Sequence, residues 1–189
     1  MIAAFRTEWL LAGYLALTTL QRFGELALAR HNGRRLRALG AREYGRGHFP
    51  AIVALHTLLP IALTAEVLLL HARPGALAPL WLGLWVAAQA LRYSAVQALG
   101  PFWNVRVLVV PGMPRVRRGP YRWLAHPNYV AVVTEMFAGP MLFGAWRTAI
   151  VFSLLDLLVL RVRIRCEEQA LALGSGPEAP TGTGGGAAT

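Results

Sequence analysis

The sequence contains no lysine and only one cysteine, and each shortage narrows the kinds of site it can build. All nineteen basic residues are arginine, against nine acidic residues, so the formal net charge is +10. The single Cys166 excludes an internal disulfide and a metal site made from cysteines. We therefore expect no metal centre of that kind.

Charged residues of both signs are few, and apolar residues take their place. The chain has 189 residues, of which 56% are hydrophobic, and a mean hydropathy of +0.45, which is high for one soluble domain. The basic surplus alone would also suit nucleic-acid binding, but such domains do not usually interleave arginines with runs of Leu, Ala and Val. We expect a bilayer as the solvent, no nucleic-acid partner, and arginines that set orientation and contact anionic headgroups.

Five apolar segments are long enough, or nearly so, to cross a bilayer as helices. We predict an all-α membrane domain over residues 1–173, a polytopic bundle of about five transmembrane helices. The predicted spans are 3–21, 49–70, 79–99, 127–143 and 148–162. We interpret the first as a span rather than a signal peptide, because Arg22 and Glu25 separate it from the nearest cleavage-like site. Residues 174–189 are rich in Gly, Pro, Thr and Ala and predict a disordered tail.

The arginines are concentrated in two of the connections between these segments. Residues 22–48 and 100–125 carry most of them, whereas 71–78 and 144–147 carry one each. Glycines interrupt the first basic connection, which we predict to be a broken interfacial helix and loop. With the amino terminus outside, five spans put every arginine-rich part on the cytoplasmic side. We therefore expect a pocket that faces the cytoplasm.

A basic turn at 115–125 leads into His126-Pro127-Asn128-Tyr129 at the start of an apolar segment. A helix that begins near Pro127 would offer free N–H groups and a partial positive charge to an anionic ligand group. Further on, Arg163 and Glu167 are four residues apart and share one face of the last predicted helix. The simplest interpretation of that spacing is a surface ion pair.

Two motifs resemble the isoprenylcysteine carboxyl methyltransferase family of integral membrane methyltransferases. They are Gly119-Pro120-Tyr121 followed by His126-Pro127-x-Tyr129, and the later Arg163-x-x-x-Glu167-Glu168. The resemblance covers residues 107–171 and implies that S-adenosylmethionine lies between the two motifs, with Arg163 near the methyl acceptor. The implied cofactor-binding residues are Met113, Pro114, Arg115, Val116, Tyr121, His126, Pro127, Asn128, Tyr129 and Glu167.

One position departs from the family pattern. Ala125 precedes the histidine where the family commonly has arginine, so we expect Arg118 or Arg122 to serve the cofactor carboxylate instead. The cofactor carries an amine, a sulfonium and a carboxylate, so its site needs charges of both signs. Glu167 suits the amine, and His126 or the helix start suits the carboxylate.

The amino-terminal half resembles a narrower bacterial branch that O-methylates long-chain alkylresorcinols and alkylpyrones made by type III polyketide synthases. Gly40-Ala41-Arg42-Glu43, His48-Phe49-Pro50 and the run at 109–112 carry this resemblance. It implies the bacterial cytoplasmic (inner) membrane and a lipophilic acceptor supplied by such a synthase. A phenol of pKa about 10 must lose its proton to react, which makes Glu43, His48 or His56 candidate bases and Arg163 the group that steadies the phenolate.

Several alternatives stay open at this point. Carboxyl methylation of isoprenylcysteine, N-methylation of phospholipids, an NADPH-dependent enzyme like the steroid reductases, and a non-catalytic membrane scaffold all fit a similar helical pattern. Glu66, Glu135 and Asp156 lie inside apolar segments, so each should be protonated or paired within the bundle. We expect Glu135 to matter most for function, the other two to be structural, and Arg92 to snorkel out of the third span.

Overall fold

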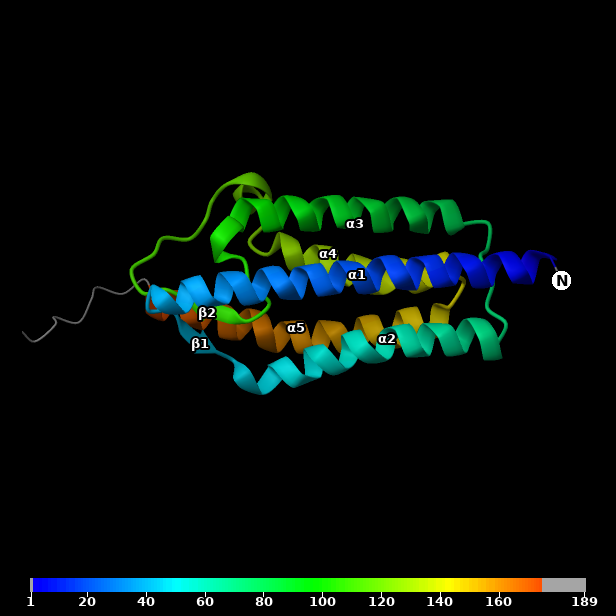
Figure 1. Cartoon of the computed structure of the whole chain (residues 1–189), viewed down its shortest axis with the longest axis horizontal. Coiled ribbons are helices and arrows are strands. Elements are labelled where there is room, and N and C mark those ends of the chain that lie inside the picture. Colours follow the sequence, from blue (N-terminus) through cyan, green and yellow to red (C-terminus); the bar gives the residue numbers. More distant parts are fainter. Residues whose placement is uncertain (1, 175–189) are drawn as a thin grey trace, which may run out of the picture.

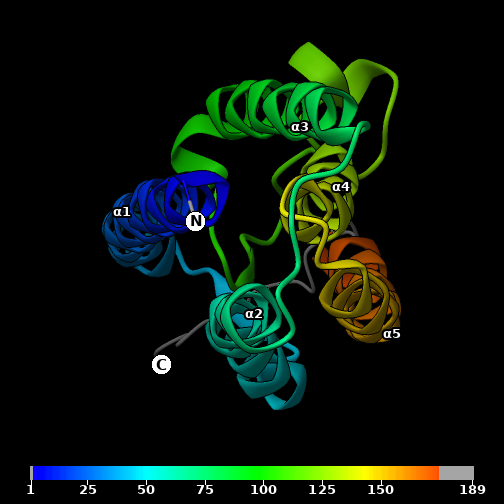
Figure 2. The ribbon, with the colours of Figure 1, turned by 90° about the vertical axis from the view of Figure 1, so that its right-hand side faces the viewer.

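A computed structural model describes residues 2–174 of the chain. Apart from Gly174, the predicted tail at 174–189 lies outside the described residues. Five long helices run along the longest axis of the molecule (Figure 1), which confirms the all-α class. Seen from one end, they form a ring in the order α1, α3, α4, α5 and α2 (Figure 2). The helices are α1 (Ile2–Ala38), α2 (Phe49–Leu69), α3 (Ala78–Leu99), α4 (Pro127–Leu142) and α5 (Trp146–Gly174).

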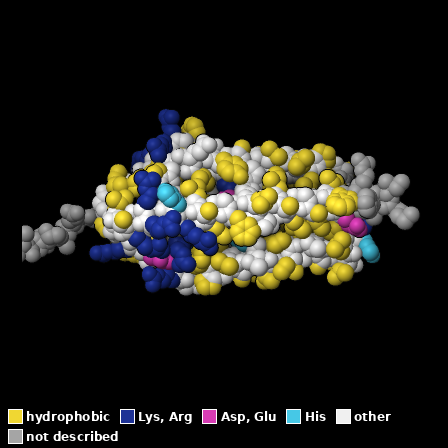
Figure 3. Space-filling model, viewed as in Figure 1, with side chains coloured by type: hydrophobic (Ala, Val, Ile, Leu, Met, Phe, Trp, Pro, Cys, Tyr) yellow, Lys and Arg dark blue, Asp and Glu magenta, His cyan; other side chains and the backbone are white. Residues whose placement is uncertain are grey.

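The surface of the bundle is apolar over most of its length and basic at one end. Arginines gather at the end where β1 (Arg42–Tyr44) and β2 (Val107–Val109) lie, and hydrophobic side chains cover much of the remaining surface in this view (Figure 3). Among the described helices, the segment Arg46–Leu69 is clearly long and apolar enough to cross a membrane. The other helices also carry exposed apolar side chains that suit contact with lipid, such as Leu20 and Leu158. That these helices cross a membrane stays a prediction.

A broken helix and loop was predicted for residues 22–48. For residues 22–38 this prediction was wrong, since α1 continues without a break to Ala38. Gly33 is needed there for close packing, because a Cβ at this position would lie 3.1 Å from the Asn104 amide nitrogen. The amide of Asn32 donates to the carbonyls of Gly100 and Trp103, at 3.1 and 2.8 Å. These tertiary contacts hold the helix where its glycines predicted an interruption.

A two-stranded antiparallel sheet closes the basic end, and the sequence had given no indication of it. β1 pairs with β2 so that Glu43 lies opposite Leu108. Val107 and Val109 face inward and pack against Ala170 of α5. The small sheet therefore fixes the 100–125 connection against the last turns of α5.

Arg92, Glu135 and Glu66 are charged groups inside the bundle that have partners, as the cost of burying a charge requires. Arg92 does not snorkel as predicted: it is 2% exposed and binds Glu135 across the contact between α3 and α4, through its Nε at 2.7 Å and also through Nη2. Glu66 accepts hydrogen bonds from the backbone N–H groups of Arg147 and Thr148, at 3.1 and 2.7 Å. It thereby caps the start of α5, in agreement with the structural role predicted for it.

Replacing Glu66 with alanine should destabilise the bundle, because the N–H groups of Arg147 and Thr148 and the Thr148 hydroxyl lose their acceptor. We expect a loss of about 1–3 kcal/mol, seen as a lower melting temperature of the detergent-purified protein. Thr57→Val on the same helix is the control, since that exposed hydroxyl bonds only to the Val53 carbonyl of its own helix. Equal melting temperatures for Glu66→Ala and the parent protein would contradict the capping role.

Candidate functional site

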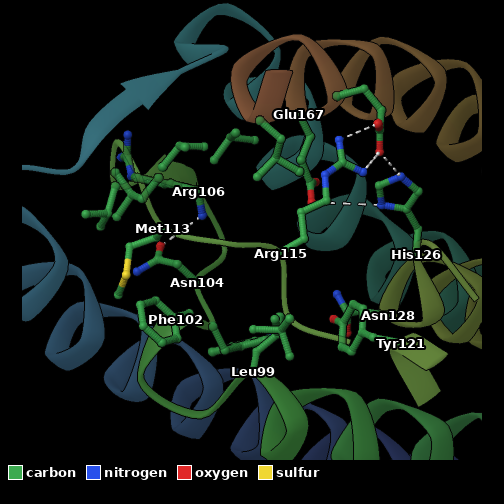
Figure 4. Close-up of a pocket in the computed structure, with 18 of the residues that line it drawn as sticks. Leu99, Phe102, Asn104, Arg106, Met113, Arg115, Tyr121, His126, Asn128 and Glu167 are labelled. Atoms are coloured by element: carbon green, nitrogen blue, oxygen red, sulfur yellow. Dashed lines mark hydrogen bonds and ion pairs between the residues drawn. The ribbon is translucent and has the colours of Figure 1, made fainter. Parts of the chain in front are cut away.

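A cavity of about 190 Å³ lies at the basic end, where α4 begins and α5 approaches its last turns (Figure 4). Arg163 lines it together with nine of the ten predicted cofactor-binding residues, while Pro127 is buried at the start of α4. The nine are Met113, Pro114, Arg115, Val116, Tyr121, His126, Asn128, Tyr129 and Glu167. The structure thus brings the two sequence motifs together around one space.

The hydroxyl of Tyr129 joins the two motifs. It donates a hydrogen bond to Glu167 and accepts one from Nε of Arg163, at 2.8 Å. Nη2 of Arg163 donates to the Val105 carbonyl at 2.7 Å, and the side chain is only 8% exposed. The surface ion pair that the spacing suggested is therefore replaced by a shared bond to Tyr129 that fixes both side chains at the cavity.

A second polar group lies beside the first. Glu168 binds Arg115 at 2.7 Å and His126 Nε2 at 3.0 Å, and the His126 ring stacks on Tyr129 with centroids 5.2 Å apart. The hydrogen bond from Arg115, followed by the nearby charges of Arg115 and His126, lowers the pKa of Glu168 despite some burial. Glu168 thus ties the 111–118 segment to α5.

Glu168 was not among the predicted site residues, although it directly follows Glu167 in the motif. The apolar wall of the cavity was not predicted from the sequence either. Phe102 and the β2 strand line it, and Asn104 and Arg106 border it (Figure 4). Asn104 and Arg106 come close because the Asn104 amide donates to the Ala29 carbonyl at 2.7 Å, a contact over 75 residues that no local pattern indicates.

One feature of the cavity points to a bound ligand, and a second describes its aromatic wall. The side-chain oxygen of Asn128 is buried and, among the described residues, has no hydrogen-bond partner, which is costly unless a ligand or water donates to it. The phenol of Tyr121 has a raised pKa, first through burial and then through the negative charge of Glu167, so it stays neutral. With Arg115 and Glu167, the cavity offers an acceptor, both signs of charge and an aromatic face.

Of the arginines in the 115–122 turn that were considered for the cofactor carboxylate, neither Arg118 nor Arg122 reaches the cavity. Arg118 donates from Nε to the Ala98 carbonyl at 2.6 Å, and Arg122 lies over the ring of Trp123. Neither side chain lines the cavity, whereas Arg115 does. Arg115 therefore supplies the positive charge that Ala125 does not.

The three candidate bases lie in different places, and none of them lines this cavity. Burial opposes ionisation of Glu43, but the hydrogen bond and charge of Arg106, with help from Arg37 and Arg46, outweigh it and lower its pKa. Glu43 is thus a weak base engaged in ion pairs. His48 lies within electrostatic range of Arg163, and His56 lines a second cavity further along the bundle.

Glu168→Gln should loosen the 111–118 segment, because it weakens the charge-assisted bonds to Arg115 and His126. We expect trypsin to cleave after Arg115, Arg117 or Arg118 severalfold faster than in the parent protein, measured by mass spectrometry of timed digests. Gln169→Ala, an exposed neighbour on α5, is the control and should leave the rate unchanged. An unaltered cleavage rate in Glu168→Gln would show that Glu168 does not hold this segment.

Comparison with known proteins gives two kinds of match. A model of the isoprenylcysteine carboxyl methyltransferase (ICMT) family matches residues 81–173, which include both motifs and most of the cavity lining. An uncharacterized protein of Bacillus subtilis (strain 168), YpbQ, is 41% identical over 166 residues, which cover 86% of this chain and 95% of that protein. An uncharacterized protein of Haemophilus influenzae is 25% identical over 152 residues, 80% of this chain and 88% of that one. No solved structure matches.

Proposed function

Since the chain belongs to the isoprenylcysteine carboxyl methyltransferase family, we propose that it transfers a methyl group from S-adenosylmethionine to a hydrophobic acceptor in the membrane. One observation carries this proposal more than any other. Tyr129, Arg163 and Glu167, from segments more than thirty residues apart, meet at one cavity through the Tyr129 hydroxyl. The arrangement provides a fixed carboxylate and a fixed guanidinium side by side, which suits a zwitterionic cofactor next to an acceptor.

The residues of the cavity fit S-adenosylmethionine by charge and hydrogen-bonding capacity. Glu167 would hold the amine, Arg115 and His126 would hold the carboxylate, and the free oxygen of Asn128 would accept an N–H of the ligand. Met113 and the neighbouring apolar wall would cover the adenine ring. When bound, the cofactor supplies a methyl group on a positively charged sulfur, for which the neutral aromatic rings at the cavity are suitable neighbours.

We infer that the acceptor is the hydroxyl of a long-chain phenolic or pyrone lipid. Arg163 is held rigidly by Tyr129 and Val105, so it presents positive charge to a developing phenolate without having to reorganise. His48 is the better placed of the two bases at this end, because Glu43 is already committed to arginines. In the transfer, a neutral His48 would take the phenol proton while the phenolic oxygen bonds to the methyl carbon, in line with the methyl–sulfur bond that breaks. The sulfur would leave as a neutral thioether.

We also propose where in the cell the protein lies and which end faces the cytoplasm. The basic end would face the cytoplasm of a bacterium, where the soluble cofactor enters, and the apolar body would lie in the inner membrane. The acceptor would reach the site from the bilayer. A type III polyketide synthase is the class of enzyme that would supply such an acceptor.

Glu167→Gln should weaken the binding of labelled S-adenosylmethionine to purified protein by about tenfold or more, because a charge-assisted bond to the amine is lost. Tyr129→Phe should also weaken it, since the hydroxyl positions Glu167. Gln169→Ala is the matched control on the same helix. Full binding in Glu167→Gln would refute this cofactor site, and no binding to the parent protein would favour a scaffold or a nicotinamide enzyme.

His48→Gln should lower the rate of methyl transfer to a long-chain alkylresorcinol while leaving cofactor affinity unchanged, because the proton acceptor is removed and the cavity is not. Proton transfer by a side chain is typically worth about 100-fold to 10,000-fold in rate. Activity would be followed by mass spectrometry of the methylated lipid. A rate within a few-fold of the parent would remove His48 from the mechanism.

The acceptor class is tested by comparing lipids from cells with and without the gene. A methylated phenolic or pyrone lipid that disappears on deletion is the expected result. Loss of N-methylated ethanolamine lipids, or of a prenylcysteine methyl ester, would assign the enzyme to one of the other acceptor classes.

A further inference from the structure

A second cavity, of about 330 Å³, lies further along the bundle and shares no lining residue with the first. Its walls come from α1, α2, α3 and α4. Thr19, Phe23 and Thr57 belong to its lining and are themselves exposed, so the cavity reaches the outer surface between α1 and α2. That surface is part of the apolar body, where a bilayer rather than water would meet it.

The floor of this cavity is unusually polar for an apolar body. Arg22 binds Glu25 at 2.7 Å and Glu135 at 3.0 Å, and Glu135 also binds Arg92. Arg92 in turn lies 3.6 Å from Glu25, which closes a ring of two arginines and two glutamates. Because the formal charges of this ring cancel, it presents no net charge that would attract an ionic ligand.

Beside the ring, hydrogen-bonding atoms are left over. The Gln21 amide nitrogen donates to Gln89 Oε1 at 2.8 Å and to Glu25 at 3.0 Å, so the Gln89 amide nitrogen and the Gln21 oxygen have no partner among the described residues. His56 Nδ1 lies 2.9 Å from the Ile52 carbonyl, which can only accept. Nδ1 therefore carries a proton, and in the neutral ring Nε2 is an acceptor for which the described residues provide no partner.

Free donors and acceptors at this depth cost free energy unless a ligand satisfies them, since a bilayer core offers few hydrogen-bonding partners. A hydroxyl both donates and accepts, so it suits a cavity whose wall offers both a free acceptor and a free donor. We propose that this cavity is a second ligand site, which takes the hydroxyl-bearing ring of a neutral amphiphile from the bilayer. Its alkyl chain would leave between α1 and α2, past Phe23.

A buried carboxyl group lies in the interior of the bundle, near several arginines. Asp156 is 2% exposed, lacks a partner for Oδ2 among the described residues, and lies within electrostatic range of Arg22, Arg92 and Arg163. Asp156 is therefore influenced both by the arginines of the charged ring and by Arg163 of the first cavity. The identification of the bound amphiphile with the methyl acceptor rests on the proposed function, whereas binding at the cavity does not.

The test measures binding of a radiolabelled long-chain alkylresorcinol to the full chain in nanodiscs without cofactor. Gln89→Met and His56→Phe should each weaken binding by about threefold to tenfold, as expected for one lost hydrogen bond. Thr18→Phe should abolish it by filling the cavity, because Thr18 lines the space and its hydroxyl bonds only within α1. Ser94→Ala, exposed on α3, is the control and should bind like the parent. Unchanged melting temperatures would show that the variants are folded.

Three results would overturn the site. The first is a lack of saturable binding to the parent protein, which would indicate a cavity that holds water only. The second is unaltered binding in Thr18→Phe. The third is equally strong cavity-dependent binding of a fatty acid or of phosphatidylethanolamine. The outcome is separable from that of the proposed function. If the phenol binds at the cavity and S-adenosylmethionine does not bind at all, the methyltransferase proposal is contradicted and the second ligand site is supported.

Discussion

The hydroxyl of Tyr129 is the contact on which the candidate site depends. It joins α4 to α5 by donating to Glu167 and accepting from Arg163, so an acid and a base that are one helical turn apart are held at the same wall of one cavity. Without it, two charged side chains in a poorly hydrated region would be free to pair with each other. Pairing would neutralise the charges that a zwitterionic ligand and an acidic hydroxyl need.

The cost of burying charge organises the rest of the bundle in the same way. Arg92 and Glu135 bind each other between α3 and α4, and Arg22 ties α1 to the same acid. Glu66 is satisfied by the backbone at the start of α5. Polar contacts of this kind determine which helices are neighbours. An apolar helix face packs about as well against lipid as against another apolar face, so it gives little preference for a particular neighbouring helix.

Much of the helical layout and of the site could be predicted from the sequence. Apolar segment lengths and Pro127 predicted most helix bounds to within a few residues, and nearly all of the residues predicted from the two motifs line the cavity. Predictions failed where contacts are distant in sequence. Gly33 suggested a break but serves the approach of Asn104, and Arg115 rather than Arg118 or Arg122 supplies the cation.

By itself, the sequence determined the helical class, the basic end and the two motifs, since these depend on composition and on residues close together in the chain. Only the tertiary structure decided which partners the charged groups have. It set Glu168 against Arg115, turned Arg92 inward, and left hydrogen-bonding atoms of Gln89 and His56 free in a second cavity. The reason is physical: a charge in an apolar bundle takes whichever counter-charge or dipole the helix packing brings within reach, and that geometry is not written in local spacing.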